Sequence, residues 1–222
     1  MSGSRWLSSR TKRAFDVVAA TVALVLVSPV IVVTALLVRL RLGAPVIFRQ
    51  QRAGRYGVPF EVVKFRSMTD ARGPDGELLP DADRLPAFGN MLRATSLDEL
   101  PQLWSVVRGD MSLIGPRPLP MKYVARYSPE QRRRLEAIPG VTGWAQVQGR
   151  NAISWPDKLA FDVWYVDHAS WRLDAKIVAL TVRAVFVGGG ITADGHVTMP
   201  EFMGTEPPNP SDAANPDVTR ET

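Results

Sequence analysis

The residues best suited to chemistry are two adjacent acids, Asp98 and Glu99, in the segment RATSLDELPQLW. Ser96-Leu97-Asp98-Glu99 has the S-x-x-E spacing of a capping box, so a helix starting here explains both acids. The same location favours reactivity, because the positive end of a helix and its free N–H groups keep a carboxylate ionised. An ionised aspartate can attack phosphorus. Neighbouring helical side chains point about 100° apart, so the two acids cannot do the same job: one could attack while the other holds a divalent ion on the substrate phosphates.

Basic residues flank these acids in the sequence. Arg93 lies upstream, near enough to neutralise phosphate charge. Arg117 lies between Pro116 and Pro118, whose rings restrict the backbone and aim the guanidinium at low entropic cost. Lys64 alternates with Arg66 along an expected strand, so both would face one side. A rigid solvated turn and a strand edge would show the same patterns, and both alternatives stay open on the residues alone.

Other candidate groups are weaker. Asp81-Ala82-Asp83 has the D-x-D pattern of many metal-dependent glycosyltransferases, but it lies in an acidic loop rich in Pro and Gly, where the pattern arises easily by chance. His168 and His196 lack ligand spacing. Arg132-Arg133-Arg134 is interpreted as a solvated or lipid-facing helix edge. The sequence contains no cysteine, which excludes disulfides and thiolate metal sites and is compatible with a reducing cytosol.

A long apolar run must position this chemistry. The 22 residues from Val17 to Val38 carry no charge, and as a straight helix they would extend roughly 33 Å, enough to cross a hydrocarbon core of about 30 Å. Pro29 removes a backbone donor and clashes with the carbonyl of Val25, which predicts a kink. The Ser28 hydroxyl would favour the bend by bonding back to the Leu24 carbonyl.

The charge on both sides of this run favours a re-entrant helix. Residues 1–66 hold eleven Lys and Arg against Asp16 and Glu61, and the basic residues flank the apolar run at both ends. Cationic flanks tend to stay cytoplasmic, so a helix that dips into the bilayer and returns keeps both clusters on the anionic leaflet. A single span and a buried soluble helix are the alternatives. The basic surplus shows no nucleic-acid motif.

The remaining sequence predicts an α-rich α+β fold with a small β element. Strands are expected at 46–48 and 60–65, a loop at 70–90, and helices at 95–107, 128–138, 155–166 and 174–187. Ser128, Pro129 and Gln131 have the positions of an N-cap, N1 and N3. The expected organisation is a basic segment and re-entrant membrane helix at 1–43, a compact cytoplasmic catalytic domain at 44–204 and a disordered acidic tail at 205–222.

Several motifs together resemble one known family. KRAFD, the apolar run broken by Ser28-Pro29, VVKFRSM, TSLDELPQLW, GDMSLIGPRP, PGVTGWAQVQGRNAISW and LDAKI occur in the order found in bacterial sugar transferases. These are the monotopic phosphoglycosyl transferases that act on polyprenol phosphate. The resemblance runs from about Lys12 to Gly204 and is to the small, single-domain form. GHVTMPEFMG also resembles the small enzymes that begin protein N-glycan assembly with a bacillosamine-type sugar.

The resemblance implies roles for individual residues. Asp98 matches the nucleophile, which forms a covalent phosphosugar and expels UMP. Glu99 matches the acid that binds Mg²⁺, and Arg93 and Arg117 match phosphate-contacting arginines. Ser28-Pro29 matches the break in the re-entrant helix. Four further residues fall at motif positions of the active site or its support: Lys64 and Arg150 as substrate-binding residues, and Asp162 and Asp174 as supporting residues.

The implied activity is transfer of a sugar 1-phosphate from a UDP-sugar to undecaprenyl phosphate at the cytoplasmic face of the inner (plasma) membrane. This would be the first membrane step of glycoconjugate or polysaccharide assembly. Undecaprenyl phosphate and anionic lipid are the expected partners, without nucleic acid, and the apolar anchor permits a homodimer. Two alternatives are a glycosyltransferase that uses Asp81 and Asp83 and releases UDP, and a non-catalytic membrane scaffold in which Asp98-Glu99 only caps a helix. The identity of the sugar stays open.

Overall fold

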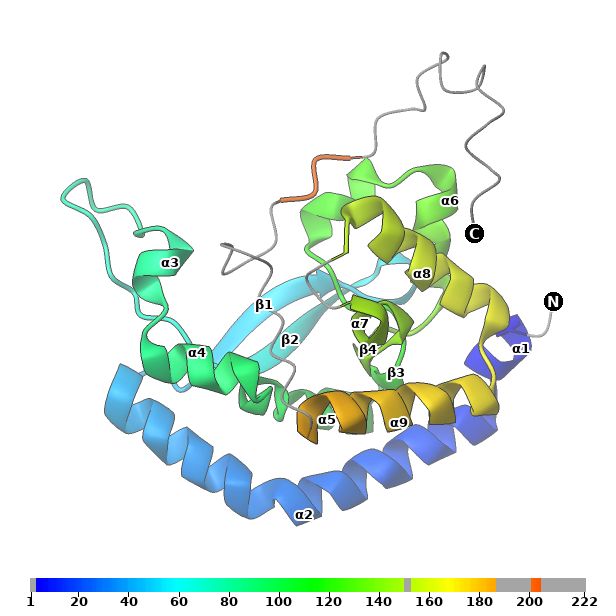
Figure 1. Ribbon diagram of the computed structural model, residues 1–222, viewed down its shortest axis with the longest axis horizontal. Helices are drawn as coiled ribbons and strands as arrows, with labels where there is room; N and C mark the ends of the chain where they lie inside the picture. Colours follow the sequence, from blue (N-terminus) through cyan, green and yellow to red (C-terminus); the bar gives the residue numbers. More distant parts are fainter. Residues whose placement is uncertain (1–2, 150–152, 187–200, 205–222) are drawn as a thin grey trace.

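The computed structural model describes residues 3–149, 153–186 and 201–204 of the 222-residue chain. Within these ranges the protein is rich in helix and contains two small two-stranded sheets (Figure 1). The predicted α-rich α+β class is confirmed for this part of the chain. The Gly-rich end of the last predicted helix and the acidic tail at 205–222 lie outside the described residues.

The N-terminal part of the chain forms a short helix and one very long helix. α1 (Gly3–Leu7) precedes α2 (Arg10–Leu42), and Ser9 caps α2 by accepting a hydrogen bond from the Lys12 amide. Apolar side chains of α2 are widely exposed, with Leu26 74% exposed. Exposed apolar surface of this extent is typical of a membrane-interacting segment. By length and composition α2 is also the one helix among the described residues that could cross a bilayer.

α2 continues as a helix through Pro29, and Figure 1 shows its axis bending near the middle. The predicted break is thus a bend within one continuous helix. The Ser28 hydroxyl donates to the Val25 carbonyl at 2.8 Å, not to Leu24 as expected. Val25 is four residues before Pro29, so its carbonyl is the one that lacks a backbone donor because proline has no N–H. Ser28 therefore supplies the hydrogen bond that Pro29 removes.

The two sheets hold the segments that lead to the candidate site. β1 (Ile47–Ala53) and β2 (Pro59–Phe65) form an antiparallel ribbon in which Phe48 opposes Lys64. β1 is longer than the predicted strand. β3 (Ser112–Ile114) pairs in parallel with β4 (Gly140–Thr142), a sheet that the sequence did not reveal. A Cβ on Gly140 would lie 2.1 Å from the Gly115 amide nitrogen, so the chain after β3 packs against β4 only because glycine is present there.

The expected loop at 70–90 contains helices. α3 (Asp81–Arg84) and α4 (Ala87–Ala94) follow Pro80 and Pro86, which occupy their N-cap positions. α5 (Gln102–Arg108) follows Pro101 in the same way, so the helix predicted at 95–107 begins later than expected. In the view of Figure 1, α2, α4, α5 and α9 (Trp171–Phe186) lie on the same side of the β1–β2 ribbon.

The C-terminal half is mainly helical. The predicted capping box at Ser128 and Gln131 is present, but α6 (Pro129–Arg132) continues as a 3₁₀ helix over Arg133–Glu136. α7 (Trp144–Gly149) precedes α8 (Trp155–His168), which agrees with the predicted third helix. Glu201 pairs with Lys122 and Arg126, and the Phe202 side chain is buried. The buried cluster around Phe202 consists of Ala53, Leu119, Tyr123, Tyr127, Leu135 and Leu159.

Candidate active site

Glu99 lies at the centre of a compact charged cluster. Its Oε1 atom accepts hydrogen bonds from Lys64 Nζ and Arg117 Nη2, each at 2.6 Å. Lys64 comes from β2, and Arg117 from the turn after β3. Burial alone would raise the pKa of Glu99, but Arg117 and Lys64 lower it well below its ordinary value. Glu99 is therefore ionised, and its charge holds two cations beside Asp98.

Asp98 is the buried acid of the cluster, with 6% of its surface exposed. Burial, and then the charge of Glu99, raise the pKa of Asp98 from 3.8 to about 6, although Lys64, Arg117 and Arg93 oppose the rise. The sequence predicts that a helix N-terminus favours the ionised form of this carboxylate, whereas burial and the charge of Glu99 oppose ionisation here. At neutral pH Asp98 is still mostly a carboxylate, and its poor solvation leaves it available to an electrophile.

The backbone around these acids is not a capping box. Ser96 has a left-handed conformation with φ of 57° and makes no side-chain capping hydrogen bond. Leu97–Glu99 forms a 3₁₀ turn, and Glu99 N–H donates to the Ser96 carbonyl at 3.1 Å. The Glu99 side chain instead binds Lys64 and Arg117. A serine held at positive φ is strained, and such strain is typical of functional sites.

Arg93 lies beside the same cluster. It belongs to the last turn of α4, and its Nε donates to Ser67 Oγ at 3.0 Å. Its positive charge is close enough to Asp98 to oppose the rise in the pKa of that group. The structure therefore brings together five of the predicted site residues: Lys64, Arg93, Asp98, Glu99 and Arg117. Arg66 instead bonds to Asp70 and to the Leu42 carbonyl at the end of α2.

Asp162 supports this cluster from behind through Arg134. Arg134 donates to Asp162 Oδ2 from Nε at 3.0 Å and from Nη2 at 2.7 Å. Arg134 Nη2 also lies 2.7 Å from the main-chain carbonyl of Arg117. Arg134 is 2% exposed, so its interpretation as a solvated or lipid-facing residue was wrong. Its neighbours Arg132 and Arg133 are not buried, and nothing in a run of three arginines distinguishes the buried one.

Two more cations near Arg117 were missed from the sequence. Burial, and then the charge of Arg117, lower the pKa of Lys158 to about 8. The same two causes lower the pKa of Arg52 in β1. Lys158 precedes Asp162 by four residues on α8, a spacing that places both on one helix face and could have identified it. Positive charge around Arg117 thus extends beyond the residues predicted.

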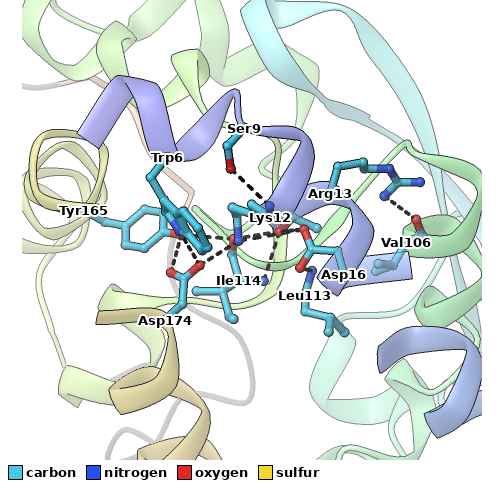
Figure 2. Close-up of polar contacts among 11 residues, drawn as sticks. Trp6, Ser9, Lys12, Arg13, Asp16, Val106, Leu113, Ile114, Tyr165 and Asp174 are labelled. Atoms are coloured by element: carbon cyan, nitrogen blue, oxygen red, sulfur yellow. Dashed lines mark hydrogen bonds and ion pairs between the residues drawn. The ribbon is translucent and has the colours of Figure 1, made fainter. Parts of the chain in front are cut away.

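Asp174 lies in a different polar network, at the start of α2 (Figure 2). It accepts hydrogen bonds from Trp6 Nε1 at 2.9 Å and Lys12 Nζ at 2.8 Å, and Tyr165 donates to it at 2.8 Å. Asp174 therefore ties α9 to the base of the apolar helix rather than contacting the Asp98 cluster. Arg150 lies outside the described residues.

The alternative metal pattern is separate from the cluster. Asp81 and Asp83 lie in the first turn of α3, where Asp81 pairs with Arg84 at 3.6 Å. Among the described residues, no group of three or more His, Cys, Asp or Glu side chains gathers as a metal cage. Mg²⁺ does not require one, because it keeps several waters and is commonly bound by one or two carboxylates plus substrate phosphates. Glu99 fits that description as a single carboxylate ligand.

Comparison with known proteins adds a family to this geometry. A model of the bacterial sugar transferase family matches residues 7–188. The uncharacterized sugar transferase EpsL of Bacillus subtilis is 53% identical over 194 residues, covering 87% of this chain and 96% of the relative. A UDP-glucose:undecaprenyl-phosphate glucose-1-phosphate transferase of Caulobacter vibrioides is 41% identical over 184 residues, 78% of this chain and 69% of the relative. A UDP-N-acetylgalactosamine-undecaprenyl-phosphate N-acetylgalactosaminephosphotransferase of Aeromonas hydrophila is 38% identical over 187 residues, 81% of this chain and 44% of the relative.

Proposed function

Because this chain belongs to the bacterial sugar transferase family, we propose that it transfers a sugar 1-phosphate from a UDP-sugar to undecaprenyl phosphate and releases UMP. The observation that carries this proposal is the buried Asp98 beside Glu99, whose carboxylate binds both Lys64 and Arg117. The cluster offers a nucleophile and, around it, cations that suit a diphosphate. Relatives named for this class of reaction support it.

The chemistry proceeds in two displacements at one phosphorus. In the first, an Asp98 oxygen bonds to the phosphorus that carries the sugar, and the bond from that phosphorus to the bridging oxygen breaks. UMP leaves with the bridging oxygen. In the second, a phosphate oxygen of undecaprenyl phosphate attacks the same phosphorus, and the bond to Asp98 breaks. The two substrates therefore use one aspartate in turn, which is ping-pong kinetics.

The surrounding residues reduce the charge that opposes these steps. Arg117, Lys64 and Arg93 supply positive charge where the diphosphate binds, as in other phosphoryl transfers. Glu99 would hold Mg²⁺, which when bound would neutralise phosphate charge and favour the departure of UMP. Burial of Asp98 excludes water from its carboxylate, which limits hydrolysis of the intermediate.

The bent α2 fits a substrate that cannot leave the membrane. Undecaprenyl phosphate is confined to the bilayer, whereas a UDP-sugar is dissolved in water. A re-entrant α2 that keeps the basic residues at both of its ends on the cytoplasmic face would place Asp98 at the boundary between these phases. The exposed apolar surface of α2 and the Ser28 hydrogen bond at its bend support this topology.

Product identity tests the proposal against its alternatives. The purified protein in lipid nanodiscs is incubated with Mg²⁺, undecaprenyl phosphate and each of UDP-glucose, UDP-galactose and UDP-N-acetylgalactosamine. We expect release of UMP with at least one of them. Release of UDP would instead support a glycosyltransferase that uses Asp81 and Asp83. No nucleotide product with a broad panel of UDP-sugars would favour a membrane scaffold.

A further inference from the structure

The start of α2 combines a membrane-facing helix with buried polar contacts to the catalytic part of the chain. Asp16 is 2% exposed and accepts hydrogen bonds from Ser112 Oγ at 2.7 Å and from the Leu113 amide at 3.3 Å (Figure 2). Arg13 donates from Nη1 to the Val106 carbonyl at 2.7 Å and from Nη2 to the Val107 carbonyl at 3.0 Å. Arg13 and Asp16 are three residues apart, so both project from one face of α2.

The two segments held by these contacts lead directly to the catalytic cluster. Val106 and Val107 are in the last turn of α5, which begins three residues after Glu99 and is about 10 Å long. Ser112 and Leu113 belong to β3, which ends three residues before Arg117. Glu99 and Arg117 meet through their 2.6 Å contact. One turn of α2 therefore holds the end of α5 and the strand β3. The chain just before α5 carries Glu99, and the chain just after β3 carries Arg117.

The contact of Arg13 with the end of α5 is favourable for local chemical reasons. The last carbonyls of a helix carry partial negative charge, so a guanidinium across those of Val106 and Val107 is favourable, although the Gly109 amide also donates to Val106. Gly109 ends α5 at φ of 104°, and a Cβ placed there would lie 3.3 Å from Arg13 Nη2. The positive φ favours glycine at the end of α5, and a larger residue there would also crowd Arg13.

We infer that Arg13 and Asp16 are positioning residues for the phosphoryl transfer. By fixing α5 and β3 to one turn of α2, they set the position of Asp98 and Glu99 relative to Arg117. The same turn begins the helix that enters the membrane, so the geometry of the cluster is set by the element that binds the bilayer. This inference rests on the proposed function, because its consequence is a change in the rate of that reaction.

The test measures kcat and KM for UMP release in nanodiscs, with the UDP-sugar that the wild-type protein uses. We expect Asp16→Asn and Arg13→Gln to lower kcat by about tenfold or more while KM for the UDP-sugar changes less than about threefold, because misplacing reacting groups by even 1 Å costs up to about a hundredfold. The loss of kcat should be smaller in Arg13→Lys than in Arg13→Gln, because the ammonium keeps the positive charge, although it does not reproduce the two-pronged contact.

The matched control is Thr21→Val on the same helix, where the exposed hydroxyl bonds only to the Val17 carbonyl of α2 itself. It should leave kcat unchanged. Thermal melting and nanodisc incorporation are measured for every variant. Unchanged kcat in Asp16→Asn and Arg13→Gln would overturn the inference, as would a loss of kcat that only follows the loss of folded protein.

If Asp16→Asn fails to fold, Ser112→Ala is measured instead. It removes the hydroxyl that donates a hydrogen bond to Asp16 and leaves the sequence of α2 unchanged. A fall in kcat of about threefold or more supports the inference, and no change overturns it. Failure of the proposed function is separate, because it is seen in the wild-type protein as a nucleotide product other than UMP. The same variant-to-wild-type ratio is then measured on that product.

Discussion

Arg134 donates a 2.7 Å hydrogen bond from Nη2 to the main-chain carbonyl of Arg117. The same guanidinium pairs with Asp162, and the two side chains are 1% and 2% exposed. Arg117 is therefore held from both ends: its backbone by a buried ion pair and its side chain by Glu99. This arrangement limits the movement of the guanidinium that we expect to contact substrate phosphate.

Loss of the acid in this pair should strongly destabilise the protein. Asp162→Ala leaves the charge of Arg134 buried without its partner, and we expect a fall in the free energy of unfolding of about 3–5 kcal/mol. The measurement is denaturant unfolding in detergent. Asp167→Ala is the matched control, because it removes the partner of the neighbouring Arg133 at a partly exposed site and should cost less than about 1 kcal/mol. Equal losses in the two variants would contradict a supporting role for Asp162.

Much of the candidate site is predictable from sequence, because each of its predicted residues belongs to a short motif. The residues that position those groups are not. Asp16 was visible only as one acid in a basic segment, since its partners Ser112 and Leu113 are nearly a hundred residues away. The left-handed Ser96 was also missed, because S-x-x-E matches a capping box, whereas in the structure Ser96 makes no capping bond and Glu99 binds Lys64 and Arg117.

The fold, like the site, was predictable from the sequence only in part. The sequence located the start and end of α8 and the start of α9 within three residues, whereas the apolar run covers only the middle of α2, which begins seven residues before it and ends four residues after it. The helices in the expected loop at 70–90 were missed because Pro80 and Pro86 were interpreted as chain breaks, whereas each precedes the first residue of a helix. A proline N-cap and a turn proline have the same local sequence, and only packing against the rest of the chain distinguishes them.

Asp98→Asn should abolish UMP release and make the protein more stable. The folded pKa of Asp98, about 6, exceeds the ordinary value of 3.8. The folded state therefore binds more protons than the unfolded state between these values, and stability falls as pH rises through that window. Above pH 6, ionised Asp98 lowers the free energy of unfolding by up to about 3 kcal/mol, and the neutral amide of Asn avoids this loss. At pH 8 the melting temperature of Asp98→Asn should be higher than that of the wild type. A lower melting temperature would contradict the burial argument.

The rate of UMP release should fall on acidification with a midpoint near pH 6. Protonation removes the nucleophile, so kcat/KM should decrease about tenfold for each pH unit below the pKa of Asp98 in the substrate-free protein. Glu99 stays ionised over this range because Arg117 and Lys64 lower its pKa. A pH–rate profile from pH 4.5 to 9, with folding checked at each pH, measures the midpoint. A midpoint near pH 4 would show that Asp98 behaves as an ordinary exposed aspartate.

The topology of α2 can be tested with single cysteines, since the chain has none of its own. In Arg5→Cys and Arg41→Cys, we expect both thiols to react from the cytoplasmic side of sealed inverted vesicles with a membrane-impermeant maleimide. Leu26→Cys serves as the control, because this exposed apolar position should be shielded by lipid. Labelling of positions 5 and 41 from opposite sides would establish a single span and refute the re-entrant helix.

Direct capture of the covalent intermediate tests the central claim. The wild-type protein and Asp98→Asn are incubated with Mg²⁺ and the accepted UDP-sugar, radiolabelled in the sugar, without undecaprenyl phosphate, and the denatured proteins are then analysed. We predict one labelled phosphosugar on the wild type, located by peptide mapping to Asp98, removed by later addition of undecaprenyl phosphate and absent from Asp98→Asn. Label that never attaches to a wild-type protein that releases UMP, or that attaches equally to Asp98→Asn, would contradict the account.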